Sequence, residues 1–484
     1  MFLYDITIMI DINQYSNIQQ RALVMQGGAS LGAYEAGAFK AIYQKINNKN
    51  SSKNGLERDR HFFDIVAGTS IGAIHGAIIV NYVVQNRKKG KSMSASWKGV
   101  DQVLYDFWED ISTLTYVEMD PSFDFRWNSF RYINSDIASA EAARKYYSVK
   151  QLLMTGARNM YDMPSSIPDR KFLDPSNTGY LYNNDPLRRL LEKKYLKDFS
   201  IKTKPPEPRL LLITVDVQEG TTVTFDSYQD QTKYENHIIE YPNGITIDHV
   251  LASASVPVHY DYTTIEAKYS TRKFWDGIIL SNTPLRELIG QHNTYWKDII
   301  QEKGTDFVLT SIWRAENENG SINKELRVPN IDKIYIVNLW PEKEELIPID
   351  PDGQTDRKND IFYHDKTEYD EKVATFVTDY IDLTKKIREI ALEHIANDNK
   401  KGEFKDELDN FLLNNEAKSK LRTGERRKYI DLLKGKFTIG KITRIDRQDD
   451  ANTISNKWAD YSYKTINQLI NEGYKQASDQ LKKE

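Results

Sequence analysis

Two stretches of the chain share one pattern, in which a short apolar run meets a glycine-rich turn and a longer helical pattern follows. Residues 21–26 form an apolar run that is too short for a helix, and residues 27–32 are rich in glycine. Residues 33–43 then carry apolar side chains at helical spacing. Residues 62–67 lead in the same way into a Gly-x-Ser-x-Gly sequence and a helical pattern up to residue 84. The pattern predicts two successive strand–turn–helix units.

Two such units in succession predict parallel strands that are joined by right-handed crossovers. The turns that follow parallel strands lie at the same carboxyl edge of the sheet, where folds of this kind bind ligands. We therefore expect the backbone amides of residues 27–32 to face Ser70, the serine of the second turn.

Further apolar runs predict more strands and helices around these two units. Strands are predicted at residues 209–217, 221–225, 273–276, 332–340 and 437–445. Helices are predicted at residues 100–110, 245–256, 369–393, 404–413, 425–433 and 458–482. Residues 342–360, rich in proline, glycine and acidic side chains, are predicted to be a linker or loop.

The periodicity is weaker between about residues 88 and 206, where Pro164, Pro168, Pro175 and Gly179 fall in one irregular stretch. So much irregular chain within a compact domain indicates an insertion or lid. Its aromatic side chains are expected to pack the insertion's own core, because exposed aromatics are uncommon. The alternative is an apolar lip for acyl chains or a membrane surface. These aromatic residues are Phe123, Phe125, Trp127, Phe130 and Tyr132.

Composition and charge narrow the possible functions. With 484 residues, 39% of them hydrophobic, the chain is long enough for one large domain with additions or for two domains. It has no cysteine, which excludes disulfides, thiolate metal sites and cysteine nucleophiles. A net charge of -4 gives no long-range attraction to nucleic acid. Residues 1–20 lack the basic region of a signal peptide, and no apolar run is suited to crossing a membrane.

The Gly-x-Ser-x-Gly sequence at residues 68–72 has the form of a nucleophile elbow. A serine at the tip of so sharp a turn needs neighbours without a Cβ, and the turn projects its Oγ out of the sheet. The alternative is a glycine–serine turn that only starts a helix.

The glycine-rich turn at residues 27–32 has three possible roles. Its backbone amides could bind the phosphate of a dinucleotide, or they could bind the oxyanion of a reaction. Alternatively, the turn only allows close packing. Ala29 and the missing downstream acid disfavour the dinucleotide.

A serine nucleophile needs a base, which is usually a histidine. In the order Ser, Asp, His, the base would be His292, His364 or His394, all in polar, helix-like contexts. His75 is expected to be a packed helix residue. Asp276, followed by Gly277 at a predicted strand tip, fits better, because a partly buried carboxylate can accept the serine proton. Asp-Gly is also a very common turn dipeptide.

Four blocks in order resemble the bacterial patatin-like phospholipases, all within residues 21–285. They are Ala22-Leu-Val-Met-Gln-Gly-Gly-Ala-Ser-Leu-Gly-Ala-Tyr-Glu-Ala-Gly37, Gly68-Thr-Ser-Ile-Gly-Ala-Ile74, Ala252-Ser-Ala-Ser-Val-Pro257, and Asp276-Gly277 with Asn282-Thr-Pro-Leu285.

The resemblance implies a Ser–Asp dyad that hydrolyses fatty-acyl esters of glycerophospholipids or related lipids, through an acyl-serine intermediate and without a metal or other cofactor. It assigns the nucleophile to Ser70 and the base to Asp276, and it assigns the other roles to backbone groups and motif glycines. The oxyanion hole would be the amides of Gly27, Gly28 and Ala29, and the supporting glycines would be Gly32, Gly68, Gly72 and Gly277.

The chain departs from the family pattern at two positions. Ala29 stands in place of a glycine, which costs about 1 kcal/mol or more if a positive φ is required there, and Ile278 follows Asp-Gly where Gly or Ala is usual. Neither departure removes a catalytic side chain. The open alternatives are a Ser–His–Asp esterase and a catalytically silent scaffold used for regulated protein interaction.

The expected fold is α/β, a patatin-like three-layer α/β/α domain with a mostly parallel central sheet, a large insertion and a mainly helical C-terminal region. The expected boundaries are 1–20 for an N-terminal segment, 21–345 for the catalytic domain with its insertion at about 88–206, and 346–484 for the helical region. The expected partner is a lipid substrate at a membrane surface and not nucleic acid, for a cytoplasmic protein that is peripheral to the membrane. The sequence does not predict an oligomeric state.

Overall fold

The structure of the protein is a computed structural model. It describes residues 19–51, 59–134, 138–163, 180–302, 304, 309, 312–313, 328–345, 347–420, 424–448 and 452–483. The irregular stretch with Pro164, Pro168, Pro175 and Gly179 lies outside the described residues, as does nearly all of the N-terminal segment 1–20.

The chain forms two compact units, each assembled from separate parts of the sequence. The sheet unit comprises residues 22–284, 335–366 and 442–484, and the arm unit comprises the described residues of 1–21, 285–334 and 367–441. The expected boundaries at 20/21 and 345/346 stay predictions.

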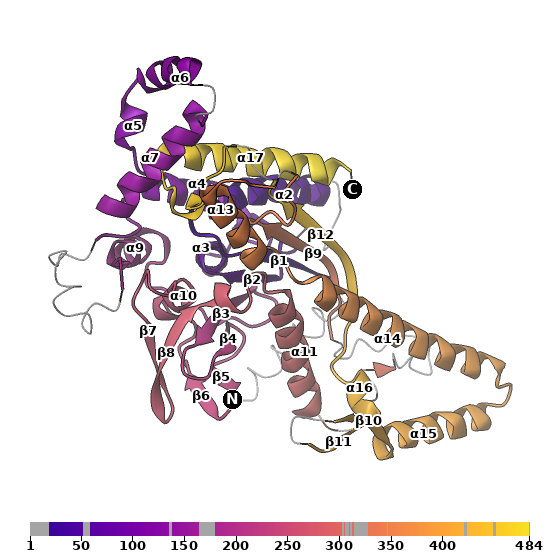
Figure 1. Ribbon diagram of the computed structural model, residues 1–484. Helices are drawn as coiled ribbons and strands as arrows, with labels where there is room; N and C mark the ends of the chain where they lie inside the picture. The colour runs from indigo at the N-terminus through magenta and orange to yellow at the C-terminus, as the bar shows by residue number, and fades with distance from the viewer. Residues whose placement is uncertain are drawn as a thin grey trace. The chain divides into compact units, whose positions relative to one another are not determined.

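A mixed sheet lies at the centre of the sheet unit (Figure 1). In the described residues its strand order is β12-β9-β1-β2-β3-β8-β7, and β4 pairs with β3 outside this path. The strands are β1 Gln20–Met25, β2 Ile65–Thr69, β3 Arg209–Asp216, β4 Thr221–Asp226, β7 Thr263–Ala267, β8 Ser270–Asp276, β9 Ile331–Asn338 and β12 Ile439–Asp446. Strands β1, β2 and β3 are parallel, whereas β8 runs antiparallel to β3 and to β7.

The sheet register brings three strand ends together. Met25, the last residue of β1, pairs with Gly68 of β2, and Thr69 of β2 pairs with Ile213 of β3. Asp276, the last residue of β8, pairs with Thr214, the next residue of β3, on the same side of β3 as β2, because β4 occupies the other side. The turns after β1 and β2 and the end of β8 therefore meet at one place in the sheet, where β2 and β8 end against consecutive residues on the same side of β3.

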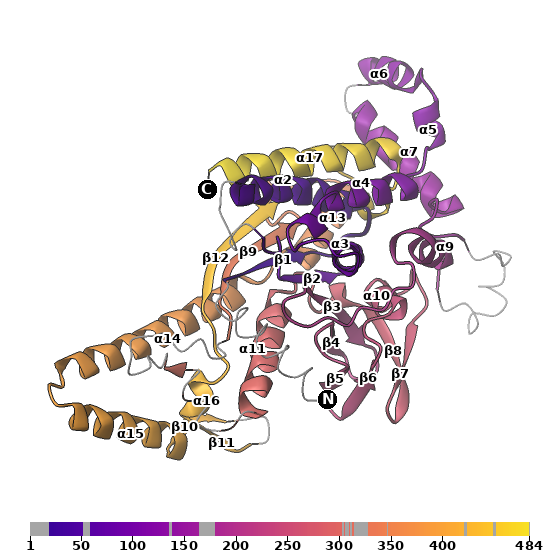
Figure 2. The same ribbon diagram turned by 180° about the vertical axis from the view of Figure 1, so that it is seen from behind.

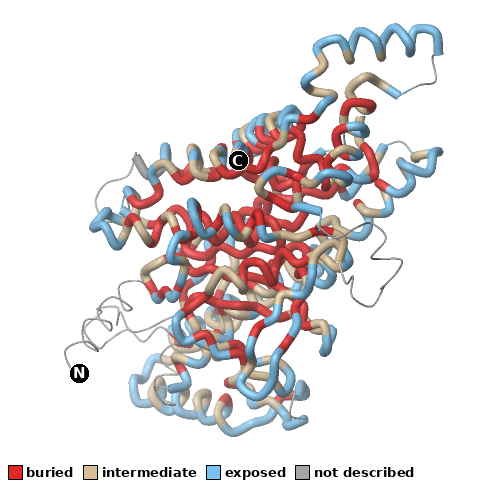
Figure 3. Tube along the Cα trace, turned by 90° about the vertical axis from the view of Figure 1, so that its left-hand side faces the viewer, coloured by how far each residue is buried: buried red, intermediate tan, exposed pale blue. Residues whose placement is uncertain are grey.

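Helices from both ends of the sequence pack together against this sheet. Helix α17 (Tyr463–Lys482) lies alongside α2 (Gly32–Ser51), as Figures 1 and 2 show. The contact needs glycine on both sides: a Cβ at Gly37 would lie 1.9 Å from the Ile470 carbonyl oxygen, and one at Gly473 would lie 2.0 Å from that of Tyr34. Helix α3 (Ile71–Lys88) is buried along most of its length. Figure 3 shows the buried parts of the chain in red.

The expected insertion begins with α4 (Val100–Ile111) and continues as α5 (Tyr116–Met119), α6 (Phe123–Ile133) and α7 (Ala140–Thr155). Its aromatic cluster is divided. Phe123 and Trp127 stack on each other and contact the ring of Tyr147, as expected for a local core. Phe125 and Tyr132 are instead largely exposed, with exposed fractions of 77% and 93%.

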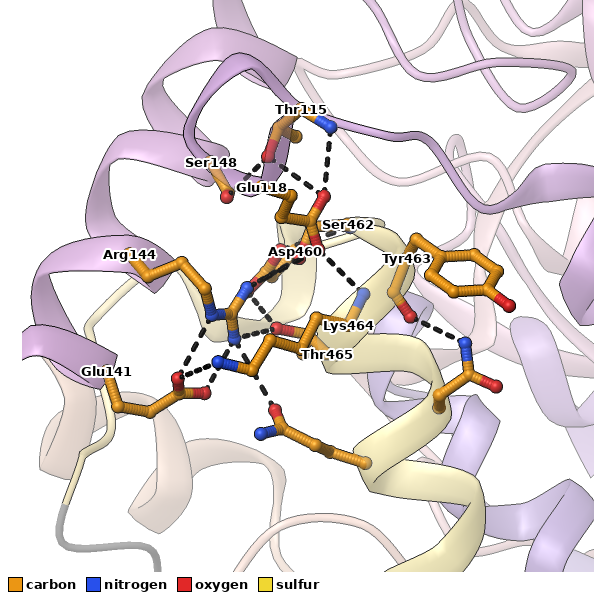
Figure 4. A network of polar contacts seen from close by, with 12 residues as sticks. Thr115, Glu118, Glu141, Arg144, Ser148, Asp460, Ser462, Tyr463, Lys464 and Thr465 are labelled. Carbon is orange, nitrogen blue, oxygen red and sulfur yellow. Dashed lines mark hydrogen bonds and ion pairs between the residues drawn. The ribbon is translucent and has the colours of Figure 1, made fainter. Parts of the chain in front are cut away.

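A buried arginine fastens the insertion to the start of α17 (Figure 4). Arg144 of α7 forms an ion pair with Glu141 and donates hydrogen bonds to the hydroxyls of Ser462 and Thr465. Glu118 of α5 lies 3.7 Å from the guanidinium and accepts a hydrogen bond from the backbone of Lys464.

The arm unit is mainly helical. Its longer helices are α11 (Leu285–Glu302), α14 (Glu368–His394) and α15 (Asp398–Asn414), and a short hairpin of β10 (Glu416–Lys420) and β11 (Arg426–Lys428) leads into α16 (Ile430–Leu433). Its small core consists of Trp296, Ile300, Ile312, Trp313, Leu412, Ile430 and Leu433. None of the helices formed by the described residues has the length and apolar character needed to cross a membrane.

The α/β fold class is confirmed, and two local predictions are wrong in part. Half of the predicted loop 342–360 belongs to α13 (Pro351–Tyr363), because Asp350 caps the backbone amides of Asp352 and Gly353 while Pro351 occupies the first turn. The predicted helix 425–433 is only partly correct, because Arg426–Lys428 form strand β11, which pairs with β10, and the helix α16 is confined to Ile430–Leu433. In both places the local capping and turn residues determined the secondary structure, and the amino-acid composition of the segment did not.

Candidate active site

Ser70 occupies a sharp turn between β2 and α3. Its backbone has φ 57° and ψ -121°, a conformation that non-glycine residues rarely adopt and that costs about 1–3 kcal/mol. The flanking glycines permit this turn: a Cβ at Gly68 would lie 2.1 Å from the Gly72 carbonyl oxygen, and one at Gly72 would lie 2.4 Å from that of Met25. The local sequence thus allows a serine at the amino end of a buried helix.

The glycine-rich turn after β1 touches Ser70. A Cβ at Gly27 would lie 3.0 Å from the Cβ of Ser70. The Gly27 amide already donates a hydrogen bond to Asn282 Oδ1 at 2.8 Å. Among the hydrogen bonds of the described residues, the amides of Gly28 and Ala29 have no acceptor. Ala29 has φ 49°, so the departure from the family's glycine falls at a position of positive φ.

Asp276 ends β8 and is fully buried. Its Oδ1 accepts a hydrogen bond from the Ile278 amide at 2.9 Å, whereas Oδ2 has no partner of normal hydrogen-bond geometry. Burial raises the pKa of Asp276 to about 7, and the nearby Ser70 hydroxyl and the Ile278 amide limit the rise. Gly277 is required here, because a Cβ would lie 2.6 Å from the Ile213 carbonyl oxygen.

Two groups that the sequence analysis left without a role support this arrangement. Ser253, at the end of α10 (Ile247–Ser253), accepts a hydrogen bond from the Ser70 amide at 3.1 Å and donates one to the Ile213 carbonyl. The carbonyl of Tyr363, at the end of α13, accepts hydrogen bonds from Asn282 and Gln26. Ser253 and Asn282 lie within the blocks that resemble the family, whereas Tyr363 carried no sequence signal.

The candidate histidines have other partners. A ring nitrogen of His292 lies 2.9 Å from the Pro329 carbonyl, that of His364 lies 2.9 Å from the Ile361 carbonyl, and that of His394 lies 2.9 Å from the Ile390 carbonyl. The groups that shift the pKa of Asp276 include no histidine.

His75 is a packed helix residue, as expected. Its ring is fully buried between Glu35, which lies 2.9 Å from Nδ1, and the indole nitrogen of Trp108, which donates to Nε2 at 3.0 Å.

Comparison with known proteins assigns the chain to a family. The family model for patatin-like phospholipase matches residues 23–289, which is more than half of the chain. No curated protein matches the chain. Among solved structures, VipD from Legionella pneumophila is similar at 13% identity and a TM-score of 0.30, over 97% of this chain and 68% of that one. From the match to the family model we conclude that the chain belongs to the patatin-like phospholipases, a family of lipid acyl hydrolases.

Proposed function

We propose that the protein hydrolyses fatty-acyl esters of glycerophospholipids or related lipids with Ser70 as nucleophile and Asp276 as base. The observation that carries this proposal is a fully buried carboxylate with a pKa of about 7 beside the hydroxyl of a serine in a strained turn. A base with a pKa near the working pH is ionised often enough to act and basic enough to accept a proton. The amino end of α3 also directs its dipole towards Ser70.

In the acylation step Ser70 Oγ attacks the ester carbonyl while its proton moves to Asp276. Negative charge then develops on the carbonyl oxygen, and the amides of Gly28 and Ala29 are the donors proposed to hold it, because the Gly27 amide is already bound to Asn282. Collapse of this intermediate releases the alcohol, which takes the proton from Asp276. The acyl group remains on Ser70.

In the deacylation step a water molecule attacks the acyl-Ser70 ester and gives its proton to Asp276. Collapse of the second intermediate releases the fatty acid and returns the proton to Ser70 Oγ. Each step uses Asp276 first as base and then as acid, so the enzyme is regenerated.

The proposed partner is a lipid substrate at a membrane surface and not nucleic acid. Family membership supports a lipid, and the exposed side chains of Phe125 and Tyr132 on α6 supply an apolar surface suited to the bilayer interface. A cytoplasmic protein that is peripheral to the membrane fits this proposal. The proposed reaction is carried by protein groups alone and needs no metal or cofactor.

Fatty-acid release from phospholipid vesicles tests the dyad with the purified full-length chain. Ser70→Ala and Asp276→Asn should each lower kcat at least about thousandfold, because both groups act in the same proton transfer. His364→Gln is a matched control in the sheet unit and should retain activity. Turnover close to wild type in either dyad variant would exclude the dyad.

The open alternatives have distinct outcomes in the same assay. Loss of activity in a His292→Gln, His364→Gln or His394→Gln variant would indicate a Ser–His–Asp esterase. A folded wild-type protein that releases no fatty acid and whose Ser70 does not react with a fluorophosphonate would indicate a silent scaffold.

A further inference from the structure

Helix α14 of the arm unit carries both buried and exposed apolar side chains. Ala374 and Ile381, seven residues apart, are buried against the arm unit. The neighbouring strip of the helix surface carries apolar side chains with exposed fractions between 43% and 74%. We call this the α14 stripe, and its members are Tyr369, Val373, Phe376, Leu383, Ile387 and Ile390.

The α14 stripe has the spacing of a coiled-coil seam. With Tyr380, which is half-buried against the arm unit's core, its members follow one another at alternating intervals of four and three residues. Such a heptad pattern, written abcdefg, keeps apolar a and d positions on one side of a helix. Here the a positions are Val373, Tyr380 and Ile387, and the d positions include Leu383 and Ile390.

The charges that flank the stripe are arranged to match a second copy of the same helix running in the opposite direction. The g positions alternate in sign as Lys372, Asp379, Lys386 and Glu393. In an antiparallel pair, g positions face g positions. Lys372 then lies opposite Glu393 of the partner subunit, and Asp379 opposite Lys386 of the partner subunit.

A parallel pair would not use these charges. There each g position faces the e position five residues further along the partner helix, and the e positions concerned are Val377, Thr384 and Ala391. The charge pattern therefore distinguishes the two directions.

The flanking charges are free to pair in this way. Within the described residues Asp379 and Glu393 make no ion pair, and both are exposed. Lys372 and Lys386 contact Glu368 and Glu389 on their own helix, in exposed pairs that contribute little and can rearrange.

We propose that the α14 stripe is a dimer interface, in which α14 pairs antiparallel with α14 of a second copy of this chain. In the register set by the charges, Val373 packs against Ile390 of the partner subunit and Phe376 against Ile387 of the partner subunit. Tyr380 and Leu383 meet at the centre. The interface is isologous, because every contact occurs twice about a two-fold axis.

Sedimentation of the full chain over a concentration range up to about 100 µM tests the interface. The wild type should be dimeric, whereas Ile387→Asp, which places a carboxylate in two layers of the seam, should be monomeric with an unchanged far-ultraviolet circular dichroism spectrum. Asp382→Lys changes a charge on the same helix outside the seam and should remain dimeric. A monomeric wild type would overturn the proposal, as would an Ile387→Asp variant that still dimerises.

A charge exchange tests the direction. Asp379→Lys and Lys386→Asp each replace two attractions by two repulsions, so each should raise the dimer Kd by about tenfold. The double variant restores opposite charges across the axis and should return the Kd to within about threefold of wild type. A double variant as weak as the single ones would overturn the antiparallel register.

The proposal is independent of the catalytic dyad. Ser70→Ala should dimerise like the wild type. Loss of activity and loss of dimerisation are therefore measured separately, by fatty-acid release and by sedimentation. A chain that stays monomeric and instead binds phosphatidylcholine vesicles through the same apolar residues would identify the stripe as a lipid contact and overturn self-association.

Discussion

The environment of Asp276 differs strongly from that of an ordinary carboxylate at the surface. It is fully buried at the end of β8, and burial raises its pKa to about 7. The carboxylate can act as a base only when it is ionised, so its titration should control the reaction rate. Because its pKa differs between the folded and unfolded states, its titration should also affect the free energy of unfolding.

The first prediction concerns the pH dependence of activity. Below pH 7 Asp276 is protonated and cannot accept the Ser70 proton, so kcat/KM should fall about tenfold per pH unit on the acid side and level off above pH 7. Initial rates with a soluble p-nitrophenyl ester between pH 5 and 9 measure this limb, with circular dichroism as a check on folding. An acid limb near pH 4, the range of an unperturbed carboxylate, would contradict the assignment.

The second prediction concerns stability. The pKa of Asp276 is higher in the folded state than in the unfolded state, so between about pH 4 and 7 the folded state binds more protons and the free energy of unfolding falls as the pH rises. Asp276→Asn removes this dependence. At pH 8 the variant should be more stable than the wild type by up to about 4 kcal/mol, and the difference should shrink towards pH 4. Urea unfolding measures both values, and an equal difference at both pH values would count against a raised pKa.

At the scale of elements, the strand–turn–helix units around Ser70 and the glycine-rich turn were predictable, because short apolar runs and glycine motifs are local signals. The register that ends β8 beside the end of β2, and so brings Asp276 close to Ser70, was expected only through the family resemblance, because it depends on pairing between distant strands. The contact of Tyr363 with Asn282 could not be predicted. Its backbone carbonyl accepts the hydrogen bond, and because every residue has such a carbonyl, the sequence gives no sign of the contact.

The packing of α17 on α2 gives a prediction about Gly473. A Cβ there would lie 2.0 Å from the Tyr34 carbonyl oxygen, so Gly473→Ala must separate the helices and should lower the free energy of unfolding by about 1–3 kcal/mol. Gly402→Ala is the matched control, because Gly402 lies in α15 with open space around it and alanine favours a helix by about 1 kcal/mol. Urea unfolding of both variants should give changes of opposite sign; a Gly473→Ala variant as stable as the control would contradict the close contact.

The Arg144 network gives a prediction about the insertion. Arg144→Ala would leave the buried carboxylates of Glu118 and Asp460 without their cation and should lower the free energy of unfolding by about 3–5 kcal/mol. Lys464→Ala removes a largely exposed partner of Glu141 and should change it by less than about 1 kcal/mol. Thermal unfolding compares the two variants, and similar small effects from both would show that the network does not hold the insertion.

At the scale of the whole molecule, the two units are assembled from interleaved segments of the chain. The sheet unit includes the last residues of β12 and helix α17, which come from the end of the sequence. The arm unit combines α11 with α14 and α15. Composition indicated a helical C-terminal region, but the contacts that assign each helix to a unit depend on side chains far apart in the sequence and have no local signature.

The most direct test of the central claim is to trap the acyl-enzyme. The full-length protein is mixed with a p-nitrophenyl fatty-acyl ester, quenched in acid and digested, and the modified peptide is mapped by mass spectrometry. We predict that the acyl group is attached to Ser70 in the wild type, is absent in Ser70→Ala and accumulates at least about a hundredfold more slowly in Asp276→Asn. Hydrolysis of the ester with an acyl group on another residue, or with none on Ser70 at any time, would contradict the account.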